Sequence, residues 1–267
     1  MRRPLSFVRY LALLVLSQGG TAWGELPSRA YPQEPIGTAF VEEFNADTLS
    51  ATLFRPVSAG RYWDSWLDGS LVTLTHGVLV VSSQIPDTRK ELPRVGGVVS
   101  TAYQLYGRFS FRARAKLAKG MVAALHLYNE DRGRYAGGRH EEIDLELSSD
   151  APDGLSWDTY HDDDWTNDSH QNTMHHGDFA RTHHMRGLEG FDSRQLNTYV
   201  IEWRSDRVNW FVNGVQVATA SDAIPTAPLQ IRLDLYHNRR WDEWLGITPS
   251  GTGMLEVDWV RYDSVKR

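Results

Sequence analysis

Three acidic residues alternate with two apolar ones between positions 142 and 146 of the chain. The segment reads Glu142-Ile143-Asp144-Leu145-Glu146. Successive side chains of a β-strand point to opposite faces, so this alternation predicts a half-buried strand. Ile143 and Leu145 would then face a hydrophobic core, and the three acids would share the opposite face.

A row of like charges on one strand face costs stability, which suggests that the row has a use. Acids at every second position lie about 6–7 Å apart, where they repel one another and raise one another's pKa values. Paired carboxyl groups suit retaining glycoside hydrolysis: one carboxylate attacks the sugar, and a second carboxyl group about 5–5.5 Å away protonates the leaving oxygen. The alternative is an exposed strand with a solvated acidic face.

Strand geometry limits how these acids could cooperate. The Cα atoms of Glu142 and Glu146 are about 13 Å apart on an ideal strand, so the two side chains must lean together over a concave, twisted sheet. Asp144 is shorter and lies between them. It fits a mediator that shares a proton with its neighbours, keeping one Glu ionised and the other protonated.

Residues 1–24 have the pattern of a secretory signal peptide. Arg2, Arg3 and Arg9 precede an apolar run, Leu11–Leu16, and small residues in Ala22-Trp23-Gly24 offer a cleavage point. The apolar run is well short of a membrane span, which disfavours an uncleaved anchor. We therefore expect a secreted or periplasmic protein that is not inserted in a membrane after signal cleavage.

Composition excludes several classes of function. The formal charge is -6, and removal of residues 1–24 takes away three Arg and no acid, which leaves -9. This charge argues against nucleic acid or an anionic membrane surface as a partner. The chain has no cysteine, so disulfides, a Cys nucleophile and thiolate metal sites are excluded.

A linker at 25–37 precedes one predicted domain, 38–267. Its short alternating runs are separated by Gly, Pro, Asn or Asp, and no long helical period is present, which indicates an all-β sandwich or barrel. The pair Asn213-Gly214 predicts a tight hairpin turn, because a type I′ turn needs positive φ at both positions. The expected strands are 71–75, 78–82, 107–116, 121–128, 198–204, 208–211, 215–218, 229–235 and 255–262.

Residues 148–193 depart from this pattern, since they are rich in Asp, His, Asn and Gly. The segment follows the acidic strand directly, so we expect a strand and a long loop beside the site. His and Asp are good metal ligands, but no spacing here matches a zinc or EF-hand pattern. A substrate loop is the favoured interpretation, and a catalytic metal is the alternative.

The chain resembles glycoside hydrolase family 16, in particular its bacterial lichenase-like members. The acidic strand, the hairpin and several further segments carry the resemblance, which covers most of the chain after the signal peptide. Each segment alone is weakly specific, but together and in order they are strong. The matching segments are 40–45, 106–109, 120–128, 198–203, 208–214, 242–246 and 257–262.

The resemblance implies a β-jelly-roll of two antiparallel sheets with a substrate groove across the concave one. It also implies that Glu142 is the nucleophile, Asp144 its helper and Glu146 the acid/base. The acidic motif lacks the extra residue that many laminarinase-like members carry as a bulge. This favours the lichenase and xyloglucan-transferase side of the family.

Substrate contacts transfer less cleanly from the family. Asp158 and Asp234 stand where lichenases have Asn, Tyr236 where they have Trp, and His126 where they have Phe. Gly97 and Val99 stand where lichenases have a sugar-gripping Glu and Arg. His140 looks more like the lead-in of the transferases. The resemblance nevertheless implies substrate-binding roles for His126, Tyr128, His140, Asp158, Tyr160, Asp234, Tyr236 and Trp244. Ordinary sheet packing is the alternative for the three tyrosines.

Asp258 matches a lichenase position that binds a structural calcium with backbone carbonyls. Oxygen ligands suit that ion, and a cysteine-free exported sandwich would gain from such a tie. The alternative is a turn or surface Asp. No cofactor is expected for catalysis.

Three functions remain open from the sequence. The preferred one is a secreted, retaining, endo-acting β-glycan hydrolase, most plausibly acting on a β-glucan polysaccharide as a monomer. The second is a transglycosylase, in which a sugar hydroxyl intercepts the intermediate. The third is a lectin-like module with the same fold, which the intact acidic triplet disfavours because a binder could relieve the repulsion by losing one acid.

Overall fold

The computed structural model describes residues 37–57, 59–86, 91–129, 140–163, 183–237 and 251–264, with the backbone alone at 140, 160–163, 183 and 184. The chain divides into two units, 1–31 and 32–267, and all described residues lie in the second. The predicted signal peptide and nearly all of the linker therefore lie outside the described residues. No helix in the described part has the length and apolar character needed to cross a membrane.

The described residues form strands and one short 3-10 helix, η1 (Gly69–Leu71). Runs of alternating polarity separated by turn residues produce the longer strands, as the sequence predicts. The strands of two or three residues at 54–56, 60–62, 65–67, 94–95 and 183–185 were not among those expected. The strands are β1 (Phe40–Glu42), β2 (Phe54–Pro56), β3 (Gly60–Tyr62), β4 (Ser65–Leu67), β5 (Val72–Thr75), β6 (Val78–Gln84), β7 (Arg94–Val95), β8 (Gly97–Ser100), β9 (Gly107–Lys116), β10 (Val122–Tyr128), β11 (His140–Ser148), β12 (Leu155–Asp163), β13 (His183–Met185), β14 (Asn197–Trp203), β15 (Val208–Val212), β16 (Val215–Ala220), β17 (Gln230–Tyr236) and β18 (Met254–Asp263).

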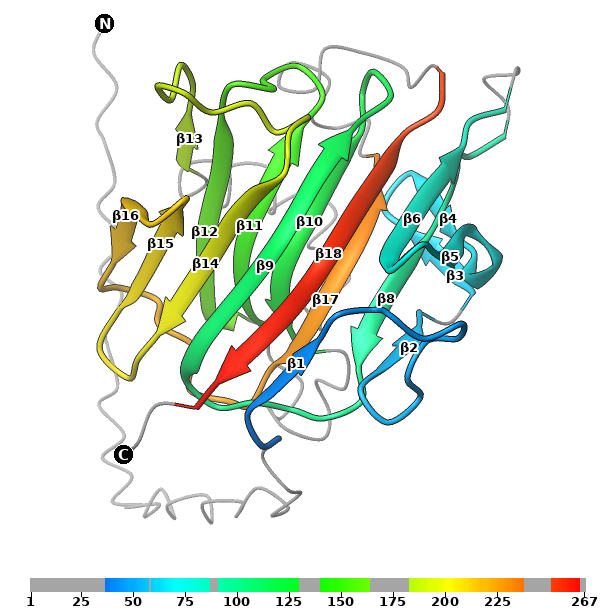
Figure 1. Cartoon of the computed structure of the whole chain (residues 1–267). Coiled ribbons are helices and arrows are strands. Elements are labelled where there is room, and N and C mark those ends of the chain that lie inside the picture. The colour runs from blue at the N-terminus through cyan, green and yellow to red at the C-terminus, as the bar shows by residue number, and fades with distance from the viewer. Residues whose placement is uncertain are drawn as a thin grey trace, which may run out of the picture. The chain divides into compact units, whose positions relative to one another are not determined.

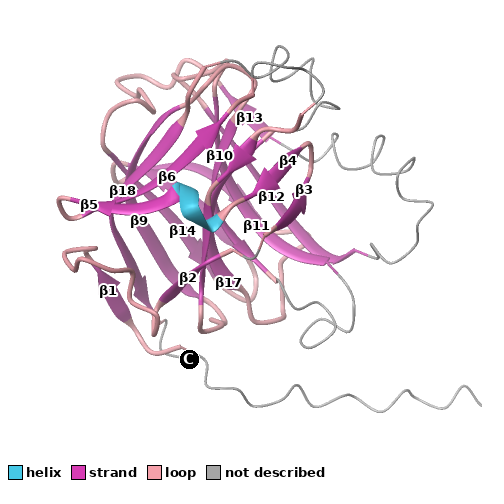
Figure 2. Cartoon of the chain, turned by 90° about the vertical axis from the view of Figure 1, so that its right-hand side faces the viewer, coloured by secondary structure: helices cyan, strands magenta, loops and turns pink. Residues whose placement is uncertain are grey.

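Among the described residues the strands form two sheets that lie face to face (Figure 1, and Figure 2 from the side). One sheet has the order β16-β15-β14-β9-β18-β6-β7-β4-β3, with β1 on β18 and β5 on β6. The other has the order β13-β12-β11-β10-β17-β8-β2. The strand pairings of the described residues are antiparallel, except that of β4 with β7. The predicted all-β sandwich is confirmed.

The core lies between the sheets and comes from the inward faces of both. Phe109 and Phe111 of β9 belong to the same buried cluster as Leu125 of β10 and Ile143 and Leu145 of β11. Alternation along each strand dictates this arrangement, because every second residue must face the partner sheet. The core therefore fixes which face of β11 carries its acids.

The predicted hairpin at Asn213-Gly214 is confirmed. Both residues have positive φ, 50° and 83°, as a type I′ turn requires. Val212 and Val215 pair directly across the turn, so β15 and β16 form an antiparallel ribbon at the edge of the larger sheet.

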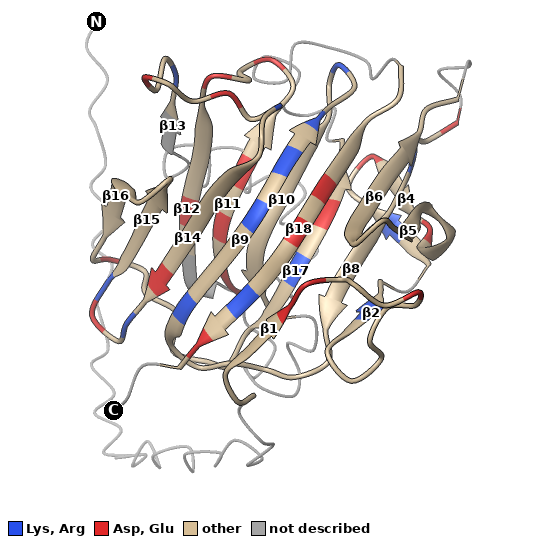
Figure 3. Cartoon of the chain, in the orientation of Figure 1, with Lys and Arg blue, Asp and Glu red and all other residues tan. Residues whose placement is uncertain are grey.

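The outer face of the larger sheet carries a ladder of opposite charges. Figure 3 shows basic residues along β9 beside acidic residues along β18. Arg114 lies directly opposite Glu256, with its Nε 2.5 Å from a carboxylate oxygen. Such cross-strand pairs on an open face add little stability each, but they keep this face polar. The acids of β11 have a different setting, on the outer face of the other sheet.

We expect Leu145→Ala to lower the free energy of unfolding by about 2–5 kcal/mol, because it removes a large buried side chain and leaves a cavity. Leu145 is fully buried between the sheets. Urea unfolding followed by tryptophan fluorescence measures the loss. Val215→Ala is the control, since Val215 is 64% exposed on β16, and we expect a change within about 0.5 kcal/mol. Equal losses in the two variants would contradict the assigned core.

Candidate active site

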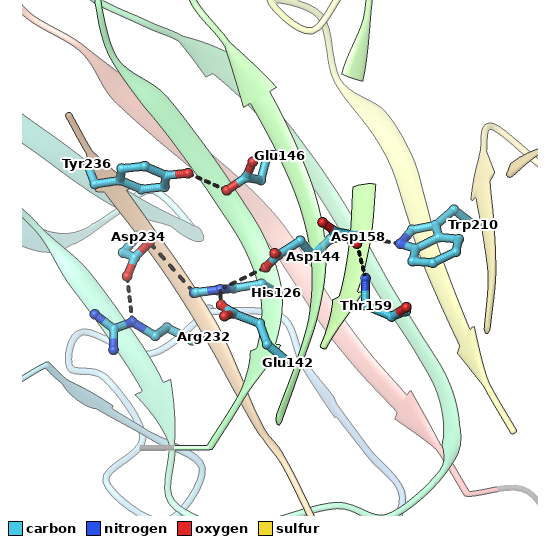
Figure 4. A network of polar contacts seen from close by, with 10 residues as sticks. All are labelled: His126, Glu142, Asp144, Glu146, Asp158, Thr159, Trp210, Arg232, Asp234 and Tyr236. Atoms are coloured by element: carbon cyan, nitrogen blue, oxygen red, sulfur yellow. Dashed lines mark hydrogen bonds and ion pairs between the residues drawn. The ribbon is translucent and has the colours of Figure 1, made fainter. Parts of the chain in front are cut away.

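Strand β11 presents its three acids on the face of the seven-stranded sheet that points away from the core. Ile143 and Leu145 lie in the core, so alternation places Glu142, Asp144 and Glu146 together on the opposite face. Figure 4 shows these carboxyl groups among side chains of the neighbouring strands β10, β12 and β17.

The acidic triplet itself is regular. Glu142, Asp144 and Glu146 pair in one constant register with β12, where Asp144 faces Asp158. The register shifts only before the triplet, between His140 and Glu142. The absence of a bulge within residues 142–146 is therefore confirmed.

The residue at the register shift is Glu141, which anchors the start of the acidic segment. Its side chain is buried and accepts hydrogen bonds from the backbone N–H groups of Thr226 and Ala227, at 2.8 and 3.3 Å. A buried carboxylate needs such partners. Glu141 thus ties β11 to the loop before β17.

The acidic face is more buried than a half-buried strand predicts, and this corrects the sequence-based expectation. Asp144 and Glu146 are only 8% and 7% exposed. Glu142 is the most exposed of the three acids, with 13% of its side chain exposed against 11% of the Asp144 side chain. The reason is that polar and aromatic side chains from the flanking strands pack beside the acids. The expected groove above them stays a prediction.

Glu146 is held by the hydroxyl of Tyr236, which donates a short hydrogen bond to its carboxylate. Tyr236 lies on β17, and β10 runs between the two strands. Ala124 is the β10 residue opposite Glu146, and its small side chain leaves room for the tyrosine to reach across. Desolvation by burial raises the pKa of Glu146 to about 7, against the lowering effect of the Tyr236 hydroxyl.

The surroundings of Asp144 favour its protonated form. Burial, followed by the negative charge of Glu142, raises its pKa well above the ordinary value. The backbone of the same residue is fixed through the core, since the indole N–H of Trp210 donates to the Asp144 carbonyl at 2.8 Å. A protonated Asp144 is a hydrogen-bond donor between two glutamates, which matches the predicted mediator role.

His126 lies against two of the acids. It is on β10 and 2% exposed, and its Nδ1 is 2.8 Å from Glu142 Oε1 and 3.4 Å from Asp144 Oδ1. Burial alone would lower the pKa of His126. Its interactions with the carboxyl groups of Asp144, Asp234 and Glu142 outweigh burial and raise the pKa well above the ordinary value. These contacts favour the cationic form of the imidazole.

On its other side, His126 faces a buried ion pair on β17. Its Nε2 is 3.8 Å from Asp234 Oδ1, and the second Asp234 oxygen is 2.5 Å from Arg232 Nε. Burial would raise the pKa of Asp234, but Arg232 and His126 lower it below the ordinary value. The Arg232 guanidinium lies over the ring of Tyr62, 4.3 Å from its centroid, and 5.5 Å from that of Tyr128.

The structure brings together most, but not all, of the predicted substrate-binding residues. His126, Asp234 and Tyr236 are almost fully buried against the acids or their partners. Tyr128 is half-buried and stacks on His126, with 5.9 Å between ring centroids. Asp158 is buried on β12. Contact of these residues with a sugar stays a prediction.

Three predicted substrate residues cannot be placed as side chains. His140 and Tyr160 are described by their backbone only, on β11 and β12, where Tyr160 lies opposite Glu142. Trp244 lies outside the described residues. Residues 164–182 of the Asp/His-rich segment also lie outside them. Its predicted strand is present as β12.

Besides Glu141, four residues of the site were not among the predictions. Arg232 had an available signal, because Gln230, Arg232, Asp234 and Tyr236 alternate on one face of β17. Ala124 had a weaker one, as a small residue two positions before His126. Tyr62 and Trp210 contact the site from strands that are distant in the sequence. Local sequence patterns do not predict such long-range contacts.

Asp258, the predicted calcium ligand, lies at a register shift between Val257 and Trp259 of β18. Its Oδ2 is 3.1 Å from Arg112 Nε, so a guanidinium already supplies positive charge to this carboxylate. This pairing matches the alternative of a surface Asp at least as well as an ion site. The structural calcium stays a prediction, which melting temperatures measured in calcium and in EDTA would test.

Comparison with known proteins extends the geometric evidence. The family model for glycosyl hydrolases family 16 matches residues 87–261, which include the acidic strand. The chain belongs to glycosyl hydrolase family 16. It is accordingly a glycoside hydrolase, as its acidic strand predicts.

Relatives within family 16 include several bacterial beta-glucanases. The beta-glucanase of Brevibacillus brevis is 26% identical over 245 residues, which are 88% of this chain and 85% of that protein. Bacillus licheniformis beta-glucanase has a TM-score of 0.70 at 22% identity, covering 86% of this chain and 99% of that chain. A lichenase derived from a mouse hindgut metagenome has a TM-score of 0.69 at 22% identity, covering 86% and 100%. These similarities confirm the predicted family 16 fold.

We expect Tyr236→Phe to move the basic limb of the pH profile of kcat/KM to higher pH. The lost hydroxyl lowers the pKa of Glu146, so its removal lets burial raise that pKa further and extends the pH range in which the acid is protonated. A hydrogen bond to a charged group is worth about 1.5–3 kcal/mol, so the shift should be about one to two pH units.

Tyr199→Phe is the matched control for this shift. Tyr199 is a buried tyrosine on β14 in the other sheet, and its hydroxyl contacts Asn197 at 3.5 Å. Initial rates between pH 5 and 10 on any glycan that the enzyme cleaves give both profiles. An unchanged basic limb in Tyr236→Phe, or the same shift in the control, would show that Tyr236 does not tune Glu146.

Proposed function

We propose that the protein is an exported, retaining, endo-acting β-glycan hydrolase with Glu142 as nucleophile and Glu146 as acid/base. The observation that carries the proposal is the contrast between these two glutamates on one strand face. Glu142 contacts the cationic His126 at 2.8 Å, which favours a carboxylate. Burial raises the pKa of Glu146 to about 7, which favours a proton donor near neutral pH. Such paired but unequal acids are the usual arrangement for acid and nucleophile.

The first half-reaction consumes the charge of one glutamate and the proton of the other. The Glu142 carboxylate attacks the anomeric carbon and forms a glycosyl ester, while the bond from that carbon to the leaving oxygen breaks. Glu146 gives its proton to the leaving oxygen and becomes a carboxylate. Asp144, whose pKa is raised, can then share its proton with the two glutamates.

The second half-reaction restores both groups. A water molecule attacks the anomeric carbon, the ester bond to Glu142 breaks, and Glu146 takes the proton of the water. Two inversions at the same carbon give net retention. Interception of the ester by a sugar hydroxyl instead of water would give transglycosylation, the alternative that the sequence leaves open.

The proposed substrate is a polysaccharide, and a β-glucan fits best. The named relatives are beta-glucanases, and this supports the choice without fixing the linkage. The departures at Gly97 and Val99 leave the sugar contacts unlike those that the resemblance implies for lichenases. Export is supported by the signal-peptide pattern of residues 1–24. No cofactor is proposed for the catalytic steps.

We expect Glu142→Gln to reduce turnover by at least about a thousandfold, because the amide cannot form the ester. Reducing-sugar release from a panel of β-1,3-, mixed-linkage β-1,3-1,4-, xyloglucan and galactan substrates, with sizing of the products, measures turnover and endo action. The melting temperature should stay close to that of the wild type. Addition of an oligosaccharide acceptor distinguishes hydrolysis from transglycosylation in the same assay.

Glu256→Gln is the control, since Glu256 is a glutamate of the outer charge ladder that pairs with Arg114. It should keep wild-type turnover. Full activity of folded Glu142→Gln on every accepted glycan would exclude Glu142 as nucleophile. A wild-type protein that binds glycans of the panel but cleaves none would instead support the lectin-like reading.

A further inference from the structure

A row of alternating charges runs beneath the nucleophile, across β11, β10 and β17. It begins at the Glu142 carboxylate, passes through His126 to Asp234, and ends at Arg232, with contacts of 2.8, 3.8 and 2.5 Å. Figure 4 shows these side chains joined in sequence. Each charged group in the row therefore has only groups of opposite charge as its neighbours in the row.

The sheet register fixes the position of the histidine in this row. His126 lies opposite Arg232 on β17, and Asp234 is its diagonal neighbour on the same face. On the other side, the continuous register of β10 with β11 sets Glu142 within reach of the same ring. Cross-strand and diagonal neighbours are the side chains that can touch on one sheet face. The imidazole thus has a carboxylate next to each nitrogen, with a hydrogen bond to Glu142 at Nδ1 and the longer ion-pair contact to Asp234 at Nε2.

Other titratable groups also face His126. Asp144 lies 3.4 Å from Nδ1, and Tyr128 stacks on the ring from the same strand. Glu146 is further away, and the charge of His126 acts to lower its pKa. Acidic groups predominate around the ring among the described residues, and the charge of the nearby Arg232 is neutralised by Asp234. The surroundings therefore favour an imidazolium rather than a neutral ring.

We infer that His126 is a cationic positioning residue, which aligns the Glu142 carboxylate for attack and stabilises it again as it departs from the glycosyl ester. This inference rests on the proposed function of Glu142. The positive charge opposes loss of the carboxylate charge in the first half-reaction and favours its return in the second. His126 touches the nucleophile and not the reacting carbon, and Asp234 with Arg232 holds it in place.

The inference has a measurable consequence for the pH profile. The acidic limb of kcat/KM reports protonation of the nucleophile, and an adjacent opposite charge moves such a limb down by about one to three pH units. His126→Gln keeps a hydrogen-bonding side chain but removes the charge, and His126→Phe removes both. We expect the acidic limb to rise by at least about one unit in both variants, with a larger fall of kcat in His126→Phe.

The same loss of charge should slow the second half-reaction. With an aryl β-glycoside of the accepted glycan, the leaving group departs readily and ester breakdown becomes limiting. We expect a larger pre-steady-state burst of phenol in His126→Gln than in the wild type, and a covalent glycosyl adduct on Glu142 by mass spectrometry of the quenched enzyme. KM for this substrate should fall together with kcat, which a loss of sugar binding would not produce.

His76→Asn is the matched control for removal of a histidine. His76 is exposed at the turn between β5 and β6, and its positive φ of 51° suits Asn. Its profile should match the wild type. Circular dichroism and melting temperature establish that each variant is folded, and imidazole NMR of the wild type, assigned with His126→Gln, reads the charge of His126 directly even if a variant unfolds.

The inference is wrong if the His126 resonances titrate with a midpoint below pH 6, which would show a neutral ring at neutral pH. It is also wrong if folded His126→Gln and His126→Phe lose activity while the acidic limb stays at its wild-type pH. Failure of the proposed function looks different. Glu142→Ala with added azide should yield an α-glycosyl azide from the aryl glycoside, and a wild type that cleaves glycans without this rescue would exclude Glu142 as nucleophile, whatever the His126 variants do.

Discussion

Burial of several carboxyl groups on one sheet face is the constraint on which this site depends. A carboxylate removed from water must be protonated, hydrogen-bonded or paired with a cation. All three kinds of stabilisation occur among neighbouring acids of this site. Asp144 is favoured in its protonated form by burial and by Glu142, Asp234 is paired with Arg232, and Glu142 contacts His126. The acids differ in protonation and pairing because their surroundings differ, since the side chains themselves are nearly alike.

The sandwich makes such an arrangement possible by fixing the backbone from behind. Ile143 and Leu145 are locked in the core, and Trp210 of the opposite sheet donates to the Asp144 carbonyl. The core residues leave β11 little freedom to rotate, so its acids cannot turn away from one another to relieve their repulsion. Ala124 adds a steric condition, because a larger side chain there would stand between Glu146 and Tyr236. Packing on one face thus enforces proximity on the other.

Much of the fold could be predicted from the sequence because its signals are local. Strand alternation and the Asn213-Gly214 turn depend on neighbours in the chain, and strand β9 was expected at its observed bounds, 107–116. The acidic triplet was found by the same alternation. The partners of the acids depend instead on strand order and register, which local patterns do not encode. That is why Arg232 was overlooked although it alternates with Asp234, and why the burial of the acids was underestimated.

The departures of this chain from the lichenase pattern are physically linked. A Cβ atom at Gly97 would lie 2.9 Å from the Cβ of Asp234, so the present backbone leaves no room for the Glu that the resemblance implies there. Asp234 in turn needs a cation in its buried position, and Arg232 with His126 supplies one on either side. A phenylalanine at 126 would leave Asp234 and Glu142 with one fewer cationic partner. The glycine, the aspartate and the two cations therefore act as a set, in which exchanging one member alone creates either a clash or an unbalanced buried charge.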